Sequence, residues 1–504
     1  MANKDFLQKL ISFMRENGLV YGPSPELYNG LAGFYTYGPL GRSLKVAIEN
    51  FLRKHFQRYQ FWEVEVPTIM PEIVWKASGH VDNFTDPVVK CKKCGAIFRV
   101  DNLIEEQLNI EVHTIDEMKR YVKDLKCPSC GGSFDENIEM VSLMLKTTVG
   151  YDTVAYARPE TATTTYLPFQ NYYYFFRRKL PFGVFQIGKA YRNEISPRQH
   201  LLRCREFTQA EAQLFIFGSQ KESYGNLERF DFKMNLITKN DETLTLTPKE
   251  AYERKIFGNK AYAFAIAITY ESFLNIGISN ENLSLRQHKD DEKAFYALDA
   301  WDVEIKLNTF NWTEVCGVHD RGDYDLTQHS KFSKQELSVF NEDTKRKEIP
   351  HIIEIAYGVD RIFFSVLDQA YDYLEKEEGK TTLRINKHIA PIQVAVFPLL
   401  KKEELKNKAK EIYETLLQEF SAIYDESGAI GRRYLRANKM GIPYAVTIDF
   451  QTLQDSTVTI RERDSERQIR IKIEQLKDVL HKLLTDKNFD DFKQYEVVTK
   501  INKK

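Results

Sequence analysis

Two adjacent segments of the chain carry charged and aromatic side chains at alternate positions. The segments "GVFQIGKAYRNE" (183–194) and "RCREFTQAEAQLF" (203–215) are predicted to form the strands of a hairpin. The period of two places Arg192 and Glu194 on one face of the first strand. It also places five side chains on one face of the second: Arg203, Arg205, Phe207, Gln209 and Glu211. An arginine fork grips phosphate oxygens, a carboxylate accepts from an exocyclic amine, and a phenyl ring stacks on a base. The face suits a nucleoside triphosphate, and a charged, solvated sheet face is the alternative.

Arg361 adds a second basic element. In "AYGVDRIFFSVL" it falls in the first turn of a predicted helix, where the helix dipole disfavours a cation by roughly 0.3–1 kcal/mol. Such a costly placement indicates a functional role, in which the guanidinium would reach the outer phosphate or cover the opposite side of the base. A salt bridge to Asp360 or Asp368 is the alternative interpretation.

Four of the six cysteines form two CxxC pairs, "CKKCG" at Cys91 and Cys94 and "CPSCGG" at Cys127 and Cys130. Each pair is followed by glycine, which permits the tight turn that aims two thiolates at one tetrahedral ion. We predict a zinc ribbon, with residues 95–126 as a helical excursion between the pairs. Because the ligand set is complete, the zinc would be structural rather than catalytic. Disulfides or unliganded thiols are the alternative.

The composition is that of a globular protein. The chain has 504 residues, 42% of them hydrophobic and 28% charged, which argues against a disordered protein. This length predicts about two to four domains. The formal net charge is −1, so a polyanion would have to be met by locally grouped Lys and Arg. No stretch has the length of a membrane span, and the opening residues lack the apolar centre of a signal peptide. We therefore expect a cytoplasmic protein without a membrane partner.

Periodicity divides the chain into four parts. Residues 1–88 contain a helical pattern followed by the strand-like "FWEVEVPTIMP", and residues 89–146 contain the cysteine pairs. Strands dominate residues 147–387, within which 219–291 is predicted to be an insertion or subdomain of mixed structure. From 388 to 504 strands alternate with helices, which predicts a separate α/β domain.

Three segments, in order along the chain, resemble the motifs of class II aminoacyl-tRNA synthetases. The helix and strand ending "FWEVEVP" resemble motif 1, "YRNEISPRQHLLRCREF" resembles motif 2, and "GVDRIFF" resembles motif 3. More narrowly, "GLVYGPSPELYNGLAGFYTYGPLG", "RPETAT", "EVCGVHDRGDYDL" and "GAIGRRYLRANKMGIPYAVTIDFQTLQDSTVTIRERD" are similar to segments of the dimeric glycyl-tRNA synthetases. The cysteine pairs between motifs 1 and 2 are similar to the archaeal branch of that family.

The resemblance implies an α+β fold. The catalytic domain would be built on a mixed, mainly antiparallel sheet with flanking helices and a zinc-ribbon insertion. A C-terminal α/β domain would bind the anticodon. The motif 1 resemblance also implies a homodimer.

The resemblance further implies which residues bind ATP. They would be Arg192, Asn193, Glu194, Arg203, Phe207, Glu304, Glu314 and Arg361. Arg192 at the α-phosphate and Arg361 at the γ-phosphate would act in catalysis, while Glu194 and Phe207 would hold the adenine. Two of the set are expected as magnesium ligands: Glu304 and Glu314.

A pocket for glycine is implied as well, formed by Arg158, Glu160, Glu211, Arg321 and Glu354. Because glycine has no side chain to grasp, such a site must hold the ammonium and carboxylate and exclude larger residues by overlap. Each of the three glutamates has an alternative interpretation as a structural ion-pair partner.

Two positions depart from the family pattern. Thr163 stands where a glutamine often follows "RPETA", and Ala356 stands where the family often has the serine of "IEPS". The second change removes a hydrogen-bonding group and slightly enlarges the expected pocket.

The implied activity is that of a glycine–tRNA ligase, which uses ATP to form glycyl-adenylate and passes the glycyl group to the 3′ end of tRNA(Gly). A helix of the last domain would contact the tRNA through Arg432, Arg433, Arg436 and Lys439. The alternative interpretation of this basic helix face is that it is only solvated. Two alternatives are a noncatalytic nucleic-acid-binding relative of the same fold and a class II synthetase for another small amino acid. The noncatalytic relative is expected to have lost the motif arginines and the glutamates that this chain retains.

Overall fold

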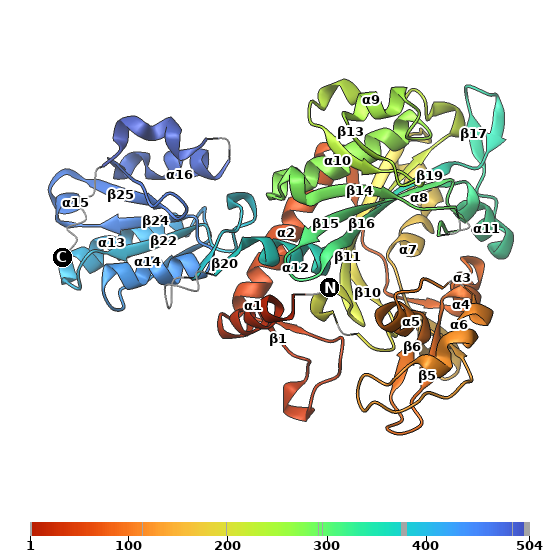
Figure 1. The fold of residues 1–504 in the computed structure, drawn as a ribbon. Helices are drawn as coiled ribbons and strands as arrows, with labels where there is room; N and C mark the ends of the chain where they lie inside the picture. Colours follow the sequence, from red (N-terminus) through yellow and green to blue (C-terminus); the bar gives the residue numbers. More distant parts are fainter. Residues whose placement is uncertain are drawn as a thin grey trace.

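The computed structural model describes residues 3–497 apart from 113, 198, 291, 295, 374–380 and 486. Figure 1 shows a large body built around a twisted sheet and a smaller α/β body that contains the C-terminal part of the chain. No helix among the described residues combines the length and the apolar character needed to cross a bilayer.

The sheet of the large body has nine strands in the described part of the chain, and it positions the site. Its strands lie in the order β13 (Thr243–Leu246), β12 (Met234–Ile237), β14 (Leu283–Gln287), β15 (Asp299–Leu307), β16 (Asn311–Gly322), β19 (His351–Gly358), β11 (Glu206–Ile216), β10 (Phe182–Tyr191) and β3 (Phe61–Glu63). Neighbours are antiparallel except for the β10–β3 and β12–β14 pairs, which are parallel. The expected mixed, mainly antiparallel sheet is therefore confirmed.

Alternation along the strands sends neighbouring side chains into different cores. Phe185 of β10 packs with the helices on one face, whereas Val184 packs with the cluster on the other face. The first face is covered by α2 (Pro39–Arg58), α10 (Lys260–Ile276) and α12 (Val359–Ala370), and the second by α7 (Ala162–Tyr166), α8 (Phe169–Phe175) and α11 (Tyr324–Ser333).

Helix α2 is tied to helix α12 by a buried ion pair. Lys45 Nζ lies 2.6 Å from Asp360 Oδ1, and both side chains are almost fully buried. Asp360 also accepts from the backbone N–H of Thr208 in β11. The carboxylate therefore fixes the start of α12 against the hairpin, as a buried charge must be paired and hydrogen-bonded.

Residues 219–291, predicted to be an insertion or subdomain of mixed structure, contain both strands and helices and extend the main sheet instead of forming a body of their own. They contribute β12, β13 and β14 to the main sheet, and α10 buries an almost wholly apolar surface against it.

The cysteine-containing segment forms its own small sheet of β6 (Ile97–Arg99), β5 (Thr85–Lys90) and β7 (Glu139–Ser142), with helices α5 (Val100–Leu108) and α6 (Ile115–Tyr121) between the cysteine pairs. The helical excursion is thus confirmed. The segment also touches the chain that follows β10, because Asn193 donates its N–H to Leu143 (2.8 Å) and Ser196 Oγ donates to the Ile97 carbonyl (2.9 Å).

The C-terminal body is the expected α/β domain. Its sheet has the order β23 (Ala422–Tyr424), β22 (Val394–Pro398), β24 (Tyr444–Ile448), β25 (Thr457–Glu462) and β26 (Gln468–Lys472). Helices α13 (Glu403–Leu416) and α16 (Leu476–Leu484) pack on one face of this sheet and α14 (Ile430–Lys439) packs on the other.

Candidate functional site

A cavity of about 240 Å³ lies over strands β11, β16 and β19, at the start of α12. Nine of the residues expected to bind ATP or glycine line it: Glu160, Arg192, Glu194, Arg203, Phe207, Glu211, Glu314, Glu354 and Arg361. They come from segments that are far apart in the chain, so only the fold brings them together. The cavity has a basic, aromatic part and an acidic part.

Arg192 and Phe207 form the basic, aromatic part. The guanidinium carbon of Arg192 lies 5.2 Å from the centre of the Phe207 ring, and its Nε donates to the Pro159 carbonyl at 3.1 Å. Glu194 lies beside them, with its carboxylate 3.4 Å from Arg203 Nε. Cations above an aromatic ring next to a carboxylate can hold phosphates and a base together.

Arg361 lies in the first turn of α12, as predicted, and its guanidinium pairs with Glu314 of β16 at 3.0 Å. It does not pair with Asp360, which binds Lys45, or with Asp368, which accepts from the backbone of Asn308. The salt-bridge interpretation within the helix was therefore wrong. Arg361 holds the pKa of Glu314 below its ordinary value, so both groups are charged where they face the cavity.

The acidic part consists of Glu160, Glu211 and Glu354. Each carboxylate is held by neighbours rather than free: Thr163 Oγ1 donates to Glu160 (2.6 Å) and Thr161 Oγ1 to Glu211 (2.5 Å). Burial, followed by repulsion from Glu354 and Glu160, raises the pKa of Glu211 to about 8. Three carboxylates facing one small space suit a compact cation such as an ammonium group.

Two residues fix the carboxylate of Glu354. His319 Nδ1 lies 2.9 Å from its Oε1, and Arg321 Nη1 lies 3.3 Å from each carboxylate oxygen. Arg321 also forms a bidentate pair with Asp325 at 2.6 and 2.8 Å. Arg321 thus supports the acidic part without lining the cavity.

Arg158 has a similar supporting position. It is 2% exposed, and its guanidinium donates to the Lys189 carbonyl (2.6 Å) and to Gln186 Oε1 (2.8 Å). A Cβ at Gly188 would lie only 2.3 Å from Arg158 Nη2, so this glycine makes room for the guanidinium. Arg158 braces strand β10 and does not line the cavity.

Three further residues singled out in the sequence lie outside the cavity lining. Glu304 pairs with Arg286 Nε of the neighbouring strand β14 at 3.1 Å and does not line the cavity. Arg205 precedes β11 and donates to the Glu194 carbonyl at 2.8 Å. Asn193 follows β10 and bonds through its backbone to Leu143.

The two departures from the family pattern have different surroundings. Thr163 is fully buried, and its hydroxyl bonds Glu160 and lies 3.1 Å from the Tyr166 hydroxyl. Ala356 lines the cavity with a methyl group. Thr163 therefore orients a carboxylate, while Ala356 contributes only shape.

Sequence reasoning missed several residues that line the cavity, among them His288, Tyr296, Asp302 and His319. No motif spacing relates them, because they come from the end of β14, the following loop, β15 and β16. The available signal was the period of two along β16, where Val315, Gly317 and His319 all face the cavity.

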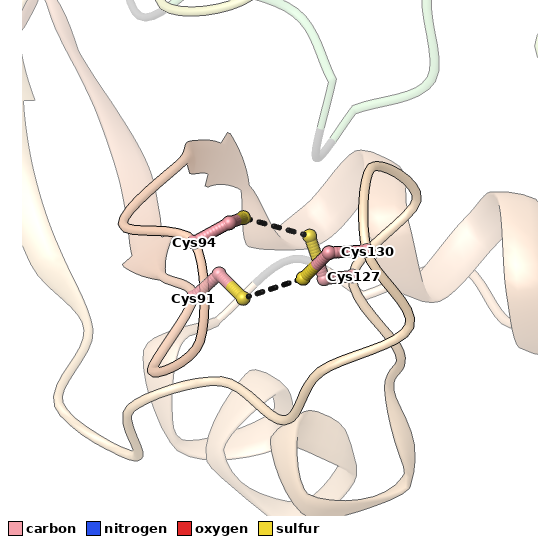
Figure 2. A group of neighbouring side chains, drawn as sticks. All are labelled: Cys91, Cys94, Cys127 and Cys130. Atoms are coloured by element: carbon pink, nitrogen blue, oxygen red, sulfur yellow. Dashed lines mark hydrogen bonds between the residues drawn. The ribbon is translucent and has the colours of Figure 1, made fainter.

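The four clustered cysteines meet at one point, as Figure 2 shows. The Sγ atoms of Cys91 and Cys130 are 3.5 Å apart, and those of Cys94 and Cys127 are 3.6 Å apart. Tetrahedral thiolates about 2.3 Å from zinc would lie about 3.8 Å from one another. The cluster can therefore hold a tetrahedral metal ion with little movement, whereas Cys204 and Cys316 lie elsewhere as free thiols.

Helix α14 does not present all four of its predicted basic residues to solvent. Arg433 is 1% exposed and donates to the carbonyls of Pro398 and Gly428, so its assignment to a tRNA contact was wrong. Arg432 and Arg436 are exposed, and Arg436 pairs with Asp425. Lys439 is half-buried near the end of the helix.

The chain matches two protein families. Residues 151–370 match the tRNA synthetase class II core domain (G, H, P, S and T), and residues 393–483 match the anticodon binding domain. The fold is similar to that of Giardia lamblia prolyl-tRNA synthetase in complex with prolyl-adenylate, with a TM-score of 0.61 at 15% identity over 94% of this chain and 75% of that one. The fold and the cavity together define a class II tRNA synthetase.

Curated relatives narrow the class. The glycine–tRNA ligase of Thermococcus kodakarensis is 39% identical over 95% of this chain and 99% of its own length. That of Methanocaldococcus jannaschii is 38% identical over 96% of this chain and 100% of its own length. The chain belongs to the glycine–tRNA ligase family.

Proposed function

We propose that this cavity joins glycine to ATP and passes the glycyl group of the resulting adenylate to tRNA(Gly). The observation that carries the proposal is the meeting of the two parts of the cavity. Three fixed carboxylates lie beside a wall of arginines and one phenyl ring, within a space of about 240 Å³. An ammonium on one side and a triphosphate on the other would bring the amino acid carboxylate to the α-phosphorus.

In the first step, the glycine carboxylate attacks the α-phosphorus in line, and pyrophosphate leaves. Arg192 would neutralise charge at the α-phosphate and Arg361 at the γ-phosphate, while Phe207 stacks on the adenine. No protein nucleophile is required, because the substrate supplies the attacking oxygen. In the second step, the terminal ribose hydroxyl of the tRNA attacks the carbonyl, and AMP leaves.

We also propose Mg²⁺ as the cofactor of the first step. Glu314 presents a charged carboxylate to the cavity, and oxygen donors of this kind are the ligands that Mg²⁺ prefers. When bound, the ion would offset the charge of the phosphate oxygens. Because Glu304 is turned toward Arg286, Glu314 is the better-placed ligand of the two.

Selection of glycine would rest on shape. Glu160, Glu211 and Glu354 would fix the ammonium, and thereby the Cα, so that a methyl group would meet the wall of the cavity. A hydrophobic contact discriminates one methyl group by only about 1–3 kcal/mol, so steric overlap has to supply the margin. Pyrophosphate exchange tests this directly: glycine should support exchange, and alanine and serine should not. Equal exchange with alanine would refute glycine selection, and no exchange with any amino acid would refute the enzyme proposal.

A pH dependence follows from Glu211. Its pKa of about 8 is set by burial and by Glu354 and Glu160, against the opposing effects of Thr161 and Arg321. Glu211 is therefore mainly protonated at neutral pH, and an incoming ammonium favours the carboxylate, so binding releases a proton. The KM for glycine should fall as pH rises from 6 to 8, approaching about tenfold per unit at the acidic end.

The comparison is the same measurement on Glu211→Gln, which cannot titrate. Its KM for glycine should be higher than that of the wild type at pH 8 and nearly independent of pH. The KM for ATP, measured in parallel, serves as the control. A wild-type KM for glycine that does not change between pH 6 and 8 would contradict the role of Glu211.

We propose that the exposed face of α14 contacts the tRNA. Arg432→Ala should raise the KM for tRNA in aminoacylation and reduce the salt dependence of binding by about one phosphate contact. Glycine-dependent exchange, which needs no tRNA, should be unchanged.

Arg433→Ala is the matched variant one residue away, and it should lose stability by about 2–4 kcal/mol because two carbonyls lose a buried donor. Urea denaturation of both variants would separate the two roles. If Arg433→Ala weakened tRNA binding without losing stability, the structural role of Arg433 would be contradicted.

We further propose a homodimer that works in the cytoplasm with its tRNA. Edge strand β3 carries Trp62, which is 55% exposed and packs at 5.4 Å on Phe175, itself 62% exposed. Exposed aromatic groups beside an unpaired sheet edge suit contact with a second copy. Sedimentation equilibrium of the wild type and Trp62→Ser tests the assembly, which should dissociate in the variant.

A further inference from the structure

Three side chains in the cavity have no substrate contact assigned to them in the proposed mechanism. His288 follows β14, Asp302 lies on β15 and His319 lies on β16, and one potential ligand atom from each lies within 4.8 Å of the others. All three line the cavity. Two imidazoles and a carboxylate converging from three chain segments form a group that could bind a metal ion.

The ligand atoms meet above Gly317. His288 Nε2 lies 2.7 Å from Asp302 Oδ2. A Cβ at position 317 would lie 3.0 Å from His319 Nε2 and 3.5 Å from Asp302 Oδ1, so both atoms border the space that the glycine leaves open. Ligands about 2.0–2.1 Å from one ion lie roughly 3.0–3.4 Å apart, a spacing that small side-chain rotations here would reach.

The surroundings orient one imidazole as a metal ligand requires. His319 Nδ1 is engaged by Glu354, and its Nε2 borders the space above Gly317 that Asp302 Oδ1 also borders. Imidazoles that bind metals commonly use the second ring nitrogen to bond a carboxylate in this way. Arg321 in turn holds Glu354, so the orientation of the His319 ring is fixed by buried neighbours.

His288 is only partly satisfied in the described structure. Its Nε2 contacts Asp302, whereas its Nδ1 is buried and has no hydrogen-bond partner among the described residues. The nearest competing cation is Arg286, whose Nη2 lies 3.6 Å from Asp302 and which mainly pairs with Glu292 at 2.8 Å. Asp302 thus keeps a carboxylate oxygen for another cation.

We propose that His288, Asp302 and His319 form a second metal site, which binds Zn²⁺ in preference to Mg²⁺. Two nitrogen donors and one oxygen donor favour a zinc-like ion over Mg²⁺, which prefers oxygen alone. Three protein ligands leave at least one coordination position, which faces the cavity and would take water or a substrate oxygen. The site deepens the proposed function of this cavity, but the inference rests on the side-chain geometry and would survive a change of substrate.

The test counts metal ions in the full-length protein without ATP, glycine or tRNA. Protein saturated with Zn²⁺ and freed of excess metal should hold two equivalents per chain, one at the four cysteines and one at the histidine site. Asp302→Asn, which keeps the shape of the side chain, and His319→Ala should each hold one. His481→Ala, which removes an exposed histidine of α16, is the control and should hold two.

Cobalt substitution identifies the ligands. The cysteine site should give the intense near-ultraviolet charge-transfer bands of thiolate in all variants. The second equivalent should add only weak visible bands, typical of nitrogen and oxygen ligands, and should lose at least tenfold in affinity in Asp302→Asn. Circular dichroism of each variant shows whether it is folded.

One equivalent in the wild type, or two equivalents in both Asp302→Asn and His319→Ala, would overturn the second site. The outcome is distinguishable from failure of the proposed function. Glycine-dependent exchange with one bound metal rejects only the second site, and two bound metals without exchange rejects only the proposed activity.

Discussion

Arg192→Ala should lower the rate of glycine-dependent pyrophosphate exchange by about a thousandfold, which corresponds to about 4 kcal/mol of transition-state stabilisation. The guanidinium lies above Phe207 at the boundary between the acidic and basic parts, where the α-phosphate would be placed. Its hydrogen bond in the free protein is to a single carbonyl, that of Pro159. The loss should therefore fall on catalysis and leave the folding stability within about 1 kcal/mol of the wild type.

Two further variants test whether the effect is specific to the guanidinium of Arg192. Lys189→Ala removes a cation from the same hairpin, but Lys189 pairs with Glu206 at 2.9 Å outside the cavity lining, so exchange should be nearly unchanged. Arg192→Lys keeps the charge and loses the planar fork, so its rate should fall between those of the wild type and Arg192→Ala. Exchange within tenfold of the wild type in Arg192→Ala would refute the assignment.

Removing the metal ion that we propose for the four cysteines should unfold the segment that contains them. Its core is a small cluster that includes Val89, Phe98, Leu103 and Phe134, too little to hold a fold alone. Structural zinc in such sites contributes about 10 kcal/mol or more to folding. Cys127→Ser or exhaustive chelation should therefore abolish the protection of amides in residues 85–142 against hydrogen exchange.

The rest of the catalytic sheet has its own large core and should keep its protection. Cys316→Ala, which removes a buried thiol outside the cluster, is the matched control and should retain the cysteine-bound metal. Amides in the ribbon that stay protected after the metal has been removed would refute a structural role for it.

Local patterns predicted much of the fold and about half of the cavity. The period of two placed Phe207 and Glu211 on the face that the structure turns to the cavity, and the change of period at Gly358 placed Arg361 at the start of a helix. These predictions succeeded because regular strands and helices fix the direction of each side chain. The family resemblance supplied Glu160 and Glu354 and the shared role of these two residues with Glu211, which no local pattern connects.

The failures have physical causes that a local pattern does not contain. Glu304 pairs with Arg286 of the neighbouring strand instead of lining the cavity, and the hairpin strand began too late to carry Arg205 on the predicted face. Arg433 looked like a surface cation because burial of a guanidinium depends on carbonyls supplied by distant segments. His288 and His319 were missed because their proximity exists only after β14, β15 and β16 have paired.

The contact between the cysteine-containing segment and the chain after β10 has an energetic consequence. Asn193 and Ser196, which flank the glutamate of motif 2, donate to carbonyls at Leu143 and Ile97. Order in one partner therefore favours order in the other, and such coupling is reciprocal by thermodynamic necessity. A nucleotide that immobilises the loop after β10 should therefore slow the release of a metal ion from the four thiolates. The rate of metal release would then report nucleotide binding, although the cysteine cluster takes no part in the reaction.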